Sequence, residues 1–432
     1  MGMPKTIAKA LPALTLPPNP TTRSRTHILP AFPFNLTAPR TTPTITGMSQ
    51  GIAILGSTGS IGRNALRVIE ALGPEYRVVG LSAHRNVELL AQQVRRHRPQ
   101  FVAVTDGDSV APFRALTNGQ VQVLSGPDCL TDLVRHDEVD TVLTAVVGAA
   151  GLPSAMAAAR TGKRLAVANK EPLVIAGELL TRAIREHGGT LVPVDSEHSA
   201  VFQAMQCGRG GEVQRILLTG SGGPFRGAAA EELETATLEQ ALSHPTWNMG
   251  PKITIDSATM MNKALEVIEA RWLFGVPVER IEVLIHPESI VHSLVEFVDG
   301  SVLAQLGPPD MCLPIQYALT YPRRVAGLSQ RLRLEEIGAL HFEKPDPRTF
   351  RALPLAYEVA RAGGTAAAVF NAANEAAVAE FLAGRLRFPQ ILELIEHCLQ
   401  EHDVRPSPGL EELLAADAWA RKEVKDRLFV GR

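Results

Sequence analysis

A glycine-rich loop between a strand and a helix is the feature that most constrains this fold. The loop, GSTGSIG, spans Gly56 to Gly62; it follows the apolar run at residues 51–55 and precedes an amphipathic stretch at residues 63–72. The run YRVVGLSA then supplies a second strand, so the three elements form a βαβ unit. Such a unit indicates a parallel sheet, because a crossover must return the chain to the same end of that sheet.

The alternation of strand and helix continues as far as residue 194. Four further apolar runs indicate strands, with helical stretches between them, at residues 101–104, 121–124, 139–147 and 165–168. Repeated alternation favours a doubly wound parallel sheet of the Rossmann type. We therefore predict an α/β protein whose N-terminal, dinucleotide-binding domain covers residues 48–194.

Two different patterns follow the predicted sheet. Residues 195–325 contain a predicted helix at residues 258–274 and the runs IEVLIHP, SIVHSLVEF and SVLAQLG, which indicate a central α+β domain. The last two runs are joined by Asp299 and Gly300, a turn signal that predicts an antiparallel hairpin. After a linker at residues 326–345, the Ala-rich residues 346–432 predict a C-terminal α-helical bundle.

The composition excludes several classes of protein. The chain has 432 residues, 45% hydrophobic and 20% charged, with a formal net charge of −2. These values fit a globular protein of two or three domains and argue against a nucleic-acid partner. The longest uncharged run, residues 143–159, is interrupted by Gly148, Gly151 and Pro153, so we expect no membrane span. The four cysteines stand far apart, which argues against a zinc site or a disulfide framework.

The first 47 residues differ from the rest of the chain. They contain no Asp or Glu and many Pro and Thr, so we expect a leader that does not fold alone. Two interpretations remain open: a transit peptide, or an upstream extension with Met48 as the true start. We favour the extension, which implies a bacterial cytoplasmic protein. A transit peptide would instead indicate a plastid-type organelle.

The glycine loop predicts a dinucleotide site. Glycines let the backbone approach a pyrophosphate, and the next helix offers free N–H groups at its N-terminus. The alternative is a bare turn that needs glycine for its own geometry. The second strand ends in SAHRN, where NAD enzymes usually place an acid. Arg85 stands there instead and could pair with a 2′-phosphate, which favours NADPH; alternatively, His84 and Arg85 form a solvated turn.

The stretch PVDSEHSA places two acids after an apolar run. If Asp195 and Glu197 lay on a strand, both side chains would point the same way, toward the edge where parallel sheets bind ligands. Two carboxylates in one place repel each other unless a cation or a proton lies between them. Alternatively, Asp195 or Ser196 caps a helix through EHSAVFQAM. The two interpretations are evenly balanced for this stretch alone.

A later helix favours the metal interpretation. Within SATMMNKALEVIEA, Asn262, Lys263 and Glu266 are related by i+3 and i+4 spacing and share one face. That face could hold a phosphate near Ser257 and lend Glu266 to a metal ion. Oxygen ligands alone favour Mg²⁺ or Mn²⁺ over zinc. The alternative is an ordinary Lys–Glu surface pair.

A loop rich in Pro and Gly, residues 244–252, lies between these elements. It contains Trp247, Met249 and Gly250. A large aromatic side chain in such a loop can anchor a core, or it can belong to a lid that excludes water. The position of the loop, between a second glycine-rich turn (residues 220–223) and the acidic helix, favours a lid.

Taken together, the motifs resemble a known family. GSTGSIG, ANKE, PVDSEH, LLTGSGGPFR, HPTWNMG, DSATMMNKALEVIEARWLF, IHPESIVHS and NAANE are similar to the motifs of 1-deoxy-D-xylulose 5-phosphate reductoisomerases, and the resemblance runs from Ser49 to the C-terminus. It implies a homodimeric enzyme of the non-mevalonate isoprenoid pathway that requires NADPH and a divalent cation. Such an enzyme rearranges 1-deoxy-D-xylulose 5-phosphate to an aldehyde and reduces that to 2-C-methyl-D-erythritol 4-phosphate.

The resemblance also implies a cofactor site. The pyrophosphate region of NADPH would be held by Thr58, Gly59, Ser60 and Ile61. Arg85 and Asn86 would face the 2′-phosphate, beside His84, and Asn169, Glu171 and Gly250 would complete the site. His84 stands where a small residue is common in the family, and Pro172 stands where serine is usual.

The implied metal and substrate sites adjoin it. The metal ligands would be Asp195, Glu197 and Glu266, holding Mn²⁺ or Mg²⁺, with Co²⁺ as a third candidate. The substrate phosphate would be bound by Ser221, Ser257, Asn262 and Lys263. Further substrate contacts would come from Lys170, Ser196 and His244 and from the metal ligands Glu197 and Glu266. The resemblance gives catalytic roles to Glu197, Lys170 and His244, and places Trp247 and Met249 on the lid.

Two other functions fit parts of the sequence. A semialdehyde or homoserine dehydrogenase also joins a dinucleotide sheet to a second domain, but the three predicted carboxylates would then have no role. A non-catalytic NADPH-sensing regulator would need neither those carboxylates nor a phosphate site. NADPH oxidation with and without Mn²⁺ separates these alternatives.

Overall fold

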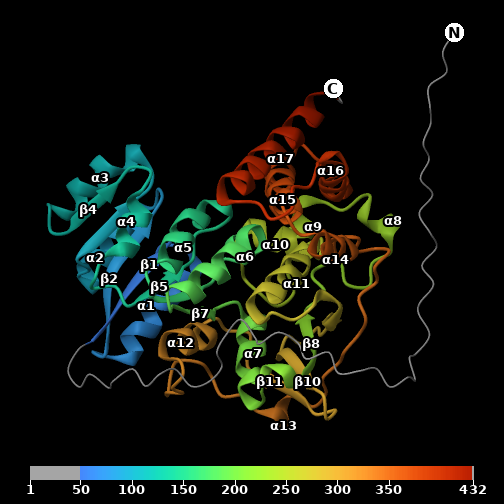
Figure 1. Ribbon diagram of the computed structural model, residues 1–432, viewed down its shortest axis with the longest axis horizontal. Coiled ribbons are helices and arrows are strands. Elements are labelled where there is room, and N and C mark those ends of the chain that lie inside the picture. Colours follow the sequence, from blue (N-terminus) through green and yellow to red (C-terminus); the bar gives the residue numbers. More distant parts are fainter. Residues whose placement is uncertain (1–48, 431–432) are drawn as a thin grey trace.

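The computed structural model describes residues 49–430, and the predicted leader lies outside them. Figure 1 shows a sheet with its helices on the left, a second sheet at the lower right and a helical bundle at the top. The predicted α/β class is confirmed. No helix of the described residues is both long and apolar enough to cross a bilayer.

The first sheet has seven parallel strands in the order β4-β3-β2-β1-β5-β6-β7. Its strands are β1 (Gln50–Leu55), β2 (Tyr76–Ala83), β3 (Phe101–Val104), β4 (Gln122–Ser125), β5 (Thr141–Thr144), β6 (Arg164–Val167) and β7 (Thr190–Pro193). The strand order reverses between β1 and β5, so the loops after these two strands flank a crevice at the carboxyl edge of the sheet. The alternation predicted all seven strands.

Six helices connect these strands. They are α1 (Ser60–Leu72), α2 (Val87–His97), α3 (Gly107–Thr117), α4 (Cys129–Arg135), α5 (Leu152–Ala159) and α6 (Glu171–Glu186). The strand predicted at residues 139–147 is shorter than expected. It ends at Thr144 because Gly148 takes a left-handed conformation (φ 77°) and a 3-10 turn, η1 (Ala149–Gly151), follows.

The second sheet has four strands in the order β11-β10-β8-β9. They are β8 (Val213–Gly220), β9 (Ile281–Ile285), β10 (Val291–Phe297) and β11 (Val302–Leu306). β10 and β11 pair antiparallel around the turn at Gly300, as predicted, and β9 pairs parallel with β8. α7 (Ser196–Ala204) leads from the first sheet to the second and packs on β10 and β11.

The helix predicted at residues 258–274 is confirmed as α11 but begins at Met261, and a separate helix precedes it. α10 (Pro251–Ala258) and α11 (Met261–Phe274) are separated at Met260, which has a left-handed conformation with φ 60°. The break turns the start of α11 toward the carboxyl end of β8. Two short helices, α8 (Ala230–Leu233) and α9 (Leu238–Leu242), precede the predicted lid loop.

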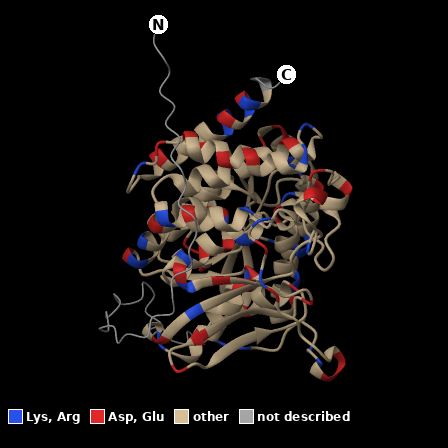
Figure 2. Cartoon of the chain, turned by 90° about the vertical axis from the view of Figure 1, so that its right-hand side faces the viewer, with Lys and Arg blue, Asp and Glu red and all other residues tan. Residues whose placement is uncertain are grey.

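The C-terminal part is helical, as predicted. It contains α14 (Ala352–Ala362), α15 (Ala366–Leu382), α16 (Phe388–Glu401) and α17 (Leu410–Val430). α15 is buried along most of its length and packs on α16 and α17. Figure 2 shows these helices above and the mixed sheet below, with acidic and basic residues interspersed.

Two short helices connect the domains. α12 (Cys312–Thr320) packs on α1 and on α7, although it lies within the predicted central domain. α13 (Leu334–Ile337) belongs to the predicted linker, which returns to the second sheet through a backbone bridge between Glu343 and Ile285. The exact domain boundaries therefore stay predictions.

Candidate active site

A cleft of about 1130 Å³ opens between the carboxyl edge of the first sheet and the second domain. It is lined by the start of α1, the loops after β6, β7 and β8, the predicted lid, and α11. Most of the predicted site residues line it: Ser60, Ile61, Lys170, Asp195, Ser196, Glu197, Ser221, His244, Trp247, Met249, Gly250, Ser257, Asn262, Lys263 and Glu266. Seven predicted cofactor residues lie outside the lining of this cleft: Thr58, Gly59, His84, Arg85, Asn86, Asn169 and Glu171.

The glycine loop fits a dinucleotide. Gly56 has φ 85°, and a Cβ there would lie 2.5 Å from the carbonyl oxygen of Ala145. A Cβ on Gly62 would lie 2.4 Å from the carbonyl oxygen of Gly56, so both positions exclude larger residues. Gly59 is the N-cap of α1 and no side chain caps this end of the helix. Its free N–H groups suit a pyrophosphate.

The residues at the end of β2 are exposed. Arg85 keeps 76% of its side chain in solvent, and its Nε lies 3.5 Å from Asp106 Oδ1. His84 Nδ1 contacts Thr105 Oγ1 at 3.0 Å. Asn86 accepts a hydrogen bond from Leu89 N and so caps α2. The exposed guanidinium group of Arg85 is therefore accessible to a ligand beside the edge of the sheet.

Asn169 and Glu171 follow β6 and differ in their contacts. Asn169 is buried, and neither Oδ1 nor Nδ2 has a hydrogen-bond partner among the described residues. A buried amide without partners is costly, so the residue fits a polar ligand group. Glu171 instead pairs with Lys252 Nζ at 3.0 Å. Burial opposes its ionisation, but the charge of Lys252 outweighs that effect and lowers the pKa of Glu171.

Asp195 caps a helix, as one interpretation of the sequence proposed, and the metal role of Asp195 and Glu197 stays a prediction. β7 ends at Pro193, so the two acids are not on a strand, and that part of the prediction was wrong. Asp195 is the N-cap of α7 and accepts a hydrogen bond from Glu197 N at 3.3 Å. Because Glu197 lies in the first helical turn, the cap itself brings both carboxylates to the cleft.

Glu266 joins them from α11. Carboxylate oxygens of Asp195, Glu197 and Glu266 all lie within 4.8 Å of one another. Burial, and then the charge of Glu197, raises the pKa of Glu266 to about 8. A group that is so costly to ionise gains much from a neighbouring cation. Three oxygen donors at this spacing fit one Mg²⁺ or Mn²⁺ ion.

Two lysines complete the cluster. Lys170 Nζ lies 2.6 Å from Asp195 Oδ2 and 3.8 Å from Glu266 Oε1. Lys263 Nζ lies 2.9 Å from Glu197 Oε1 and 2.5 Å from Glu266 Oε2. Burial lowers the pKa of each ammonium group, but the carboxylates outweigh it and raise both above the ordinary value. Both lysines are therefore cations at neutral pH.

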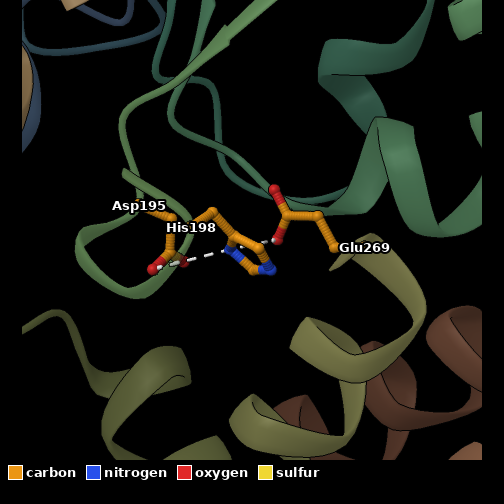
Figure 3. Close-up of side chains that lie close together, drawn as sticks. All are labelled: Asp195, His198 and Glu269. Atoms are coloured by element: carbon orange, nitrogen blue, oxygen red, sulfur yellow. Dashed lines mark ion pairs between the residues drawn. The ribbon is translucent and has the colours of Figure 1, made fainter. Parts of the chain in front are cut away.

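Sequence reasoning missed two residues behind the carboxylates. Figure 3 shows His198 between Asp195 and Glu269, with Nδ1 lying 3.9 Å from Asp195 Oδ1 and 3.4 Å from Glu269 Oε2. Its Nε2 donates to the carbonyl oxygen of Glu266 at 3.0 Å, which fixes the ring. His198 follows Glu197 and Glu269 lies one helical turn after Glu266, but their contact joins α7 to α11 and depends on how these helices pack.

The other end of the cleft is polar. His244 Nδ1 accepts hydrogen bonds from Thr246 N (3.1 Å) and Trp247 N (2.9 Å). Its Nε2 therefore carries the proton and donates to Ser221 Oγ at 3.1 Å. Burial lowers the pKa of His244, which keeps the ring neutral.

On α11, Asn262 Nδ2 donates to Glu266 Oε1 at 2.6 Å, confirming that these two residues share a helix face.

The predicted lid lines this cleft. Its last two residues, Pro251 and Lys252, belong to α10, so the irregular part ends at Gly250. Trp247 faces His292, with ring centroids 6.3 Å apart. The motif IHPESIVHS supplies four lining residues that were not predicted to belong to the site: His286, Ser289, Val291 and His292. Met311, also unpredicted, lines the cleft from the loop before α12.

Three family models match the chain. Residues 52–177 match 1-deoxy-D-xylulose 5-phosphate reductoisomerase, residues 191–274 match the C-terminal domain of the same enzyme, and residues 306–423 match the DXP reductoisomerase C-terminal domain. Together these matches cover most of the chain.

Curated relatives and solved structures agree. The 1-deoxy-D-xylulose 5-phosphate reductoisomerase of Symbiobacterium thermophilum is 52% identical over 385 residues, covering 88% of this chain and 99% of that protein. The Zymomonas mobilis enzyme, solved with NADPH, is 41% identical with a TM-score of 0.82 over 88% of this chain and 99% of its own. A DOX-P reductoisomerase solved with NADPH, fosmidomycin and magnesium is 40% identical, with a TM-score of 0.83 over 88% and 98%. The chain belongs to the 1-deoxy-D-xylulose 5-phosphate reductoisomerase family.

Proposed function

We propose that this chain converts 1-deoxy-D-xylulose 5-phosphate to 2-C-methyl-D-erythritol 4-phosphate, using NADPH and Mg²⁺ or Mn²⁺. The observation that carries the proposal is the convergence of Asp195, Glu197 and Glu266 within 4.8 Å in a cleft that begins at the glycine loop. A bare NADPH-binding regulator has no need for three carboxylates beside its cofactor.

The first sheet would hold the cofactor. Ser60 and Ile61 offer backbone N–H groups at the uncapped start of α1, with Thr58 and Gly59 beside them in the same loop, while Arg85 offers an exposed cation for a 2′-phosphate. Asn169 offers an amide without other partners. NADPH, when bound, supplies the hydride that reduces the aldehyde.

The carboxylates would hold the metal ion. Asp195 is held by its cap geometry, and Glu266 by Asn262 and Lys263, so the ligands are arranged before substrate binds. A bound divalent cation would polarise the substrate carbonyl and stabilise the negative charge that develops as a carbon–carbon bond breaks. Lys170, already cationic beside Asp195, is positioned to donate a hydrogen bond to a substrate oxygen.

The phosphate would bind beside the metal site, between α11 and the loop after β8. Ser221, Ser257, Asn262 and Lys263 line it, and His244 is bonded to Ser221. These donors suit a phosphate dianion, with Lys263 as the charged contact. The lid residues Trp247 and Met249 would exclude water from the reactive aldehyde.

The test is NADPH oxidation with 1-deoxy-D-xylulose 5-phosphate, with and without Mn²⁺. We expect turnover that requires both the substrate and the metal. NADPH binding without turnover would indicate a regulator. NADPH oxidation with aspartate semialdehyde, or NADP⁺ reduction with homoserine, would instead indicate the other dehydrogenase classes.

Two finer expectations stand with this proposal. We expect a homodimer, which sedimentation of the purified chain would measure; a monomer at assay concentrations would contradict it. We also expect a bacterial cytoplasmic protein. Mass analysis of the natural N-terminus distinguishes this from the plastid-type alternative, which predicts removal of a leader.

A further inference from the structure

The motif NAANE, residues 371–375, has no role in the proposed chemistry. It lies in the middle of α15, the buried helix of the C-terminal bundle. Asn371 and Asn374 are fully buried, and Glu375 keeps only 15% of its side chain exposed. Polar groups buried this deeply are expected to have specific partners. Asn374 and Glu375 each have a partner outside the bundle, in two different directions, and Glu375 is also held within it by Asn371 and Arg421.

Asn374 reaches the base of the lid. Its Nδ2 donates to Asp256 Oδ1 at 2.9 Å. Asp256 Oδ2 pairs with Lys252 Nζ at 2.8 Å, one turn earlier on α10. Lys252 in turn pairs with Glu171 at the start of α6. This chain of contacts connects the bundle to Lys252, the last residue of the predicted lid, and then to the predicted cofactor site.

Each link in this chain is shielded from solvent. Asp256 is 1% exposed and Glu171 4%. The carboxylates raise the pKa of Lys252 despite its burial, so the ammonium group stays charged. Buried charges that depend on each other tolerate little displacement, because loss of one partner leaves the other unpaired. Asn374 therefore fixes the orientation of Asp256 and, through it, the start of α10.

Glu375 reaches the first sheet. Its Oε1 accepts a hydrogen bond from Ala149 N at 3.1 Å, and its Oε2 pairs with Arg421 Nη2 at 2.8 Å. A Cβ on Gly148 would lie 2.9 Å from Glu375 Oε2, so the loop backbone packs directly on the carboxylate. Arg421 is itself held by Asp417 on α17.

The loop that Glu375 holds follows β5. β5 adjoins β1 where the strand order reverses, so this loop forms one wall of the crevice in which such sheets bind a dinucleotide. The other wall is the glycine loop, whose Gly56 approaches Ala145 closely. A shift of the loop after β5 would therefore change the width of the crevice.

We propose that Asn374 and Glu375 are positioning residues through which the C-terminal bundle sets the cofactor crevice and the base of the lid. Glu375 acts through the backbone of Ala149, and Asn374 acts through Asp256 and Lys252. The inference rests on the proposed use of NADPH but not on the identity of the reduced substrate.

The first experiment measures NADPH affinity, by cofactor fluorescence, without metal or substrate. In Glu375→Ala the loop after β5 loses its acceptor, and we expect the Kd for NADPH to rise about tenfold, as for one lost charge-assisted hydrogen bond. Glu375→Gln keeps an acceptor for Ala149 N and should recover most of that affinity. The KM for the phosphorylated substrate should change less than the Kd for NADPH.

The second experiment measures the lid. Hydrogen exchange of residues 244–256 should slow in the wild-type chain when NADPH and substrate analogue bind. In Asn374→Ala these residues should exchange faster, both free and bound, because Asp256 is no longer held. Melting curves and circular dichroism establish that each variant is folded.

Glu423→Gln is the matched control. Glu423 lies on α17, as Arg421 does, but pairs with His397 at 3.0 Å inside the bundle. We expect this variant to keep wild-type NADPH affinity and lid exchange. The proposal is overturned if Glu375→Ala and Asn374→Ala fold and are no less stable than Glu423→Gln, yet show wild-type NADPH affinity and wild-type hydrogen exchange of residues 244–256.

The proposed function can fail separately. A wild-type chain that binds NADPH but does not turn over 1-deoxy-D-xylulose 5-phosphate would remove that function and leave the positioning roles open to the same measurements. A wild-type chain that binds no NADPH would overturn both proposals.

Discussion

The two ends of the cofactor and substrate region are built in opposite ways. At the metal end, Asp195, Glu197 and Glu266 are fixed by a helix cap, an amide and two lysines at contact distance. At the adenosine end, Arg85 extends into solvent and its nearest acid, Asp106, lies 3.5 Å away. The metal end is arranged in advance, whereas at the adenosine end Arg85 stays largely exposed.

The difference matches what each end has to do. Charge that develops during a reaction is stabilised best by groups that need not reorganise, so the metal end benefits from burial and mutual contacts. A 2′-phosphate is already charged before binding, and an exposed arginine can close on it at little cost. Substitutions at the metal end should therefore remove activity, whereas those at the adenosine end should shift affinity.

The largest effect is expected for Glu197→Gln. The substitution keeps the shape of the side chain but removes one anionic metal ligand, so turnover should fall at least about 100-fold. NADPH affinity should stay near the wild-type value, because Glu197 is assigned to the metal ion and not to the cofactor. Parallel loss of turnover and NADPH binding would contradict the assigned role.

A smaller effect is expected for Lys263→Ala. The variant lacks the charged contact for the substrate phosphate, and the KM for 1-deoxy-D-xylulose 5-phosphate should rise about 10- to 100-fold. Because Lys263 also contacts Glu197 and Glu266, a fall in kcat should accompany it. Steady-state kinetics that show an unchanged KM would exclude Lys263 from the phosphate site.

Arg85→Ala tests the exposed end. The KM for NADPH should rise about tenfold, since one exposed ionic contact to a phosphate is lost. The KM for NADH, which lacks that phosphate, should not change. An unaltered preference between the two cofactors would show that Arg85 is only part of a solvated turn.

The smallest effect concerns pH and the lid. Burial lowers the pKa of His244 below its ordinary value of 6.5, so Nδ1 stays free to accept from Thr246 and Trp247 at neutral pH. As pH falls through this lowered pKa, Nδ1 gains a proton and the lid turn loses both bonds. In a plot of kcat/KM against pH, the wild type should therefore show a fall in kcat/KM with a midpoint below pH 6.5, and His244→Gln should not show it. A midpoint above pH 6.5, or a fall retained in the variant, would contradict this.

Much of the fold follows from local patterns in the sequence. Apolar runs bounded by glycine and polar residues predicted the seven parallel strands, and Asp299-Gly300 predicted the β10–β11 hairpin. The break at Met260 was not predictable, because neither Gly nor Pro marks it. The break depends instead on tertiary packing at the end of α10. The loop after β8 lies directly against that end, since a Cβ on Gly223 would lie 2.5 Å from the carbonyl oxygen of Ser257.

The site was only partly predictable for the same reason. Residue types and helical spacing indicated Asn262, Lys263 and Glu266 as one face, and the contacts agree. The pairs Lys252–Glu171 and His198–Glu269 join helices that are distant in sequence. Such pairs depend on how α6, α7, α10 and α11 pack, and no local pattern encodes that packing.

The most direct test of the central claim is the binding of Mn²⁺ to the substrate-free protein, measured by titration calorimetry or electron paramagnetic resonance. We predict one Mn²⁺ ion per chain and a loss of affinity of at least about 100-fold in Glu266→Gln. Glu282→Gln, which changes a carboxylate of β9 that pairs with Arg215 away from the cleft, should bind Mn²⁺ as the wild type does. Equal Mn²⁺ affinity in Glu266→Gln and the wild type would contradict a cation shared by the three carboxylates.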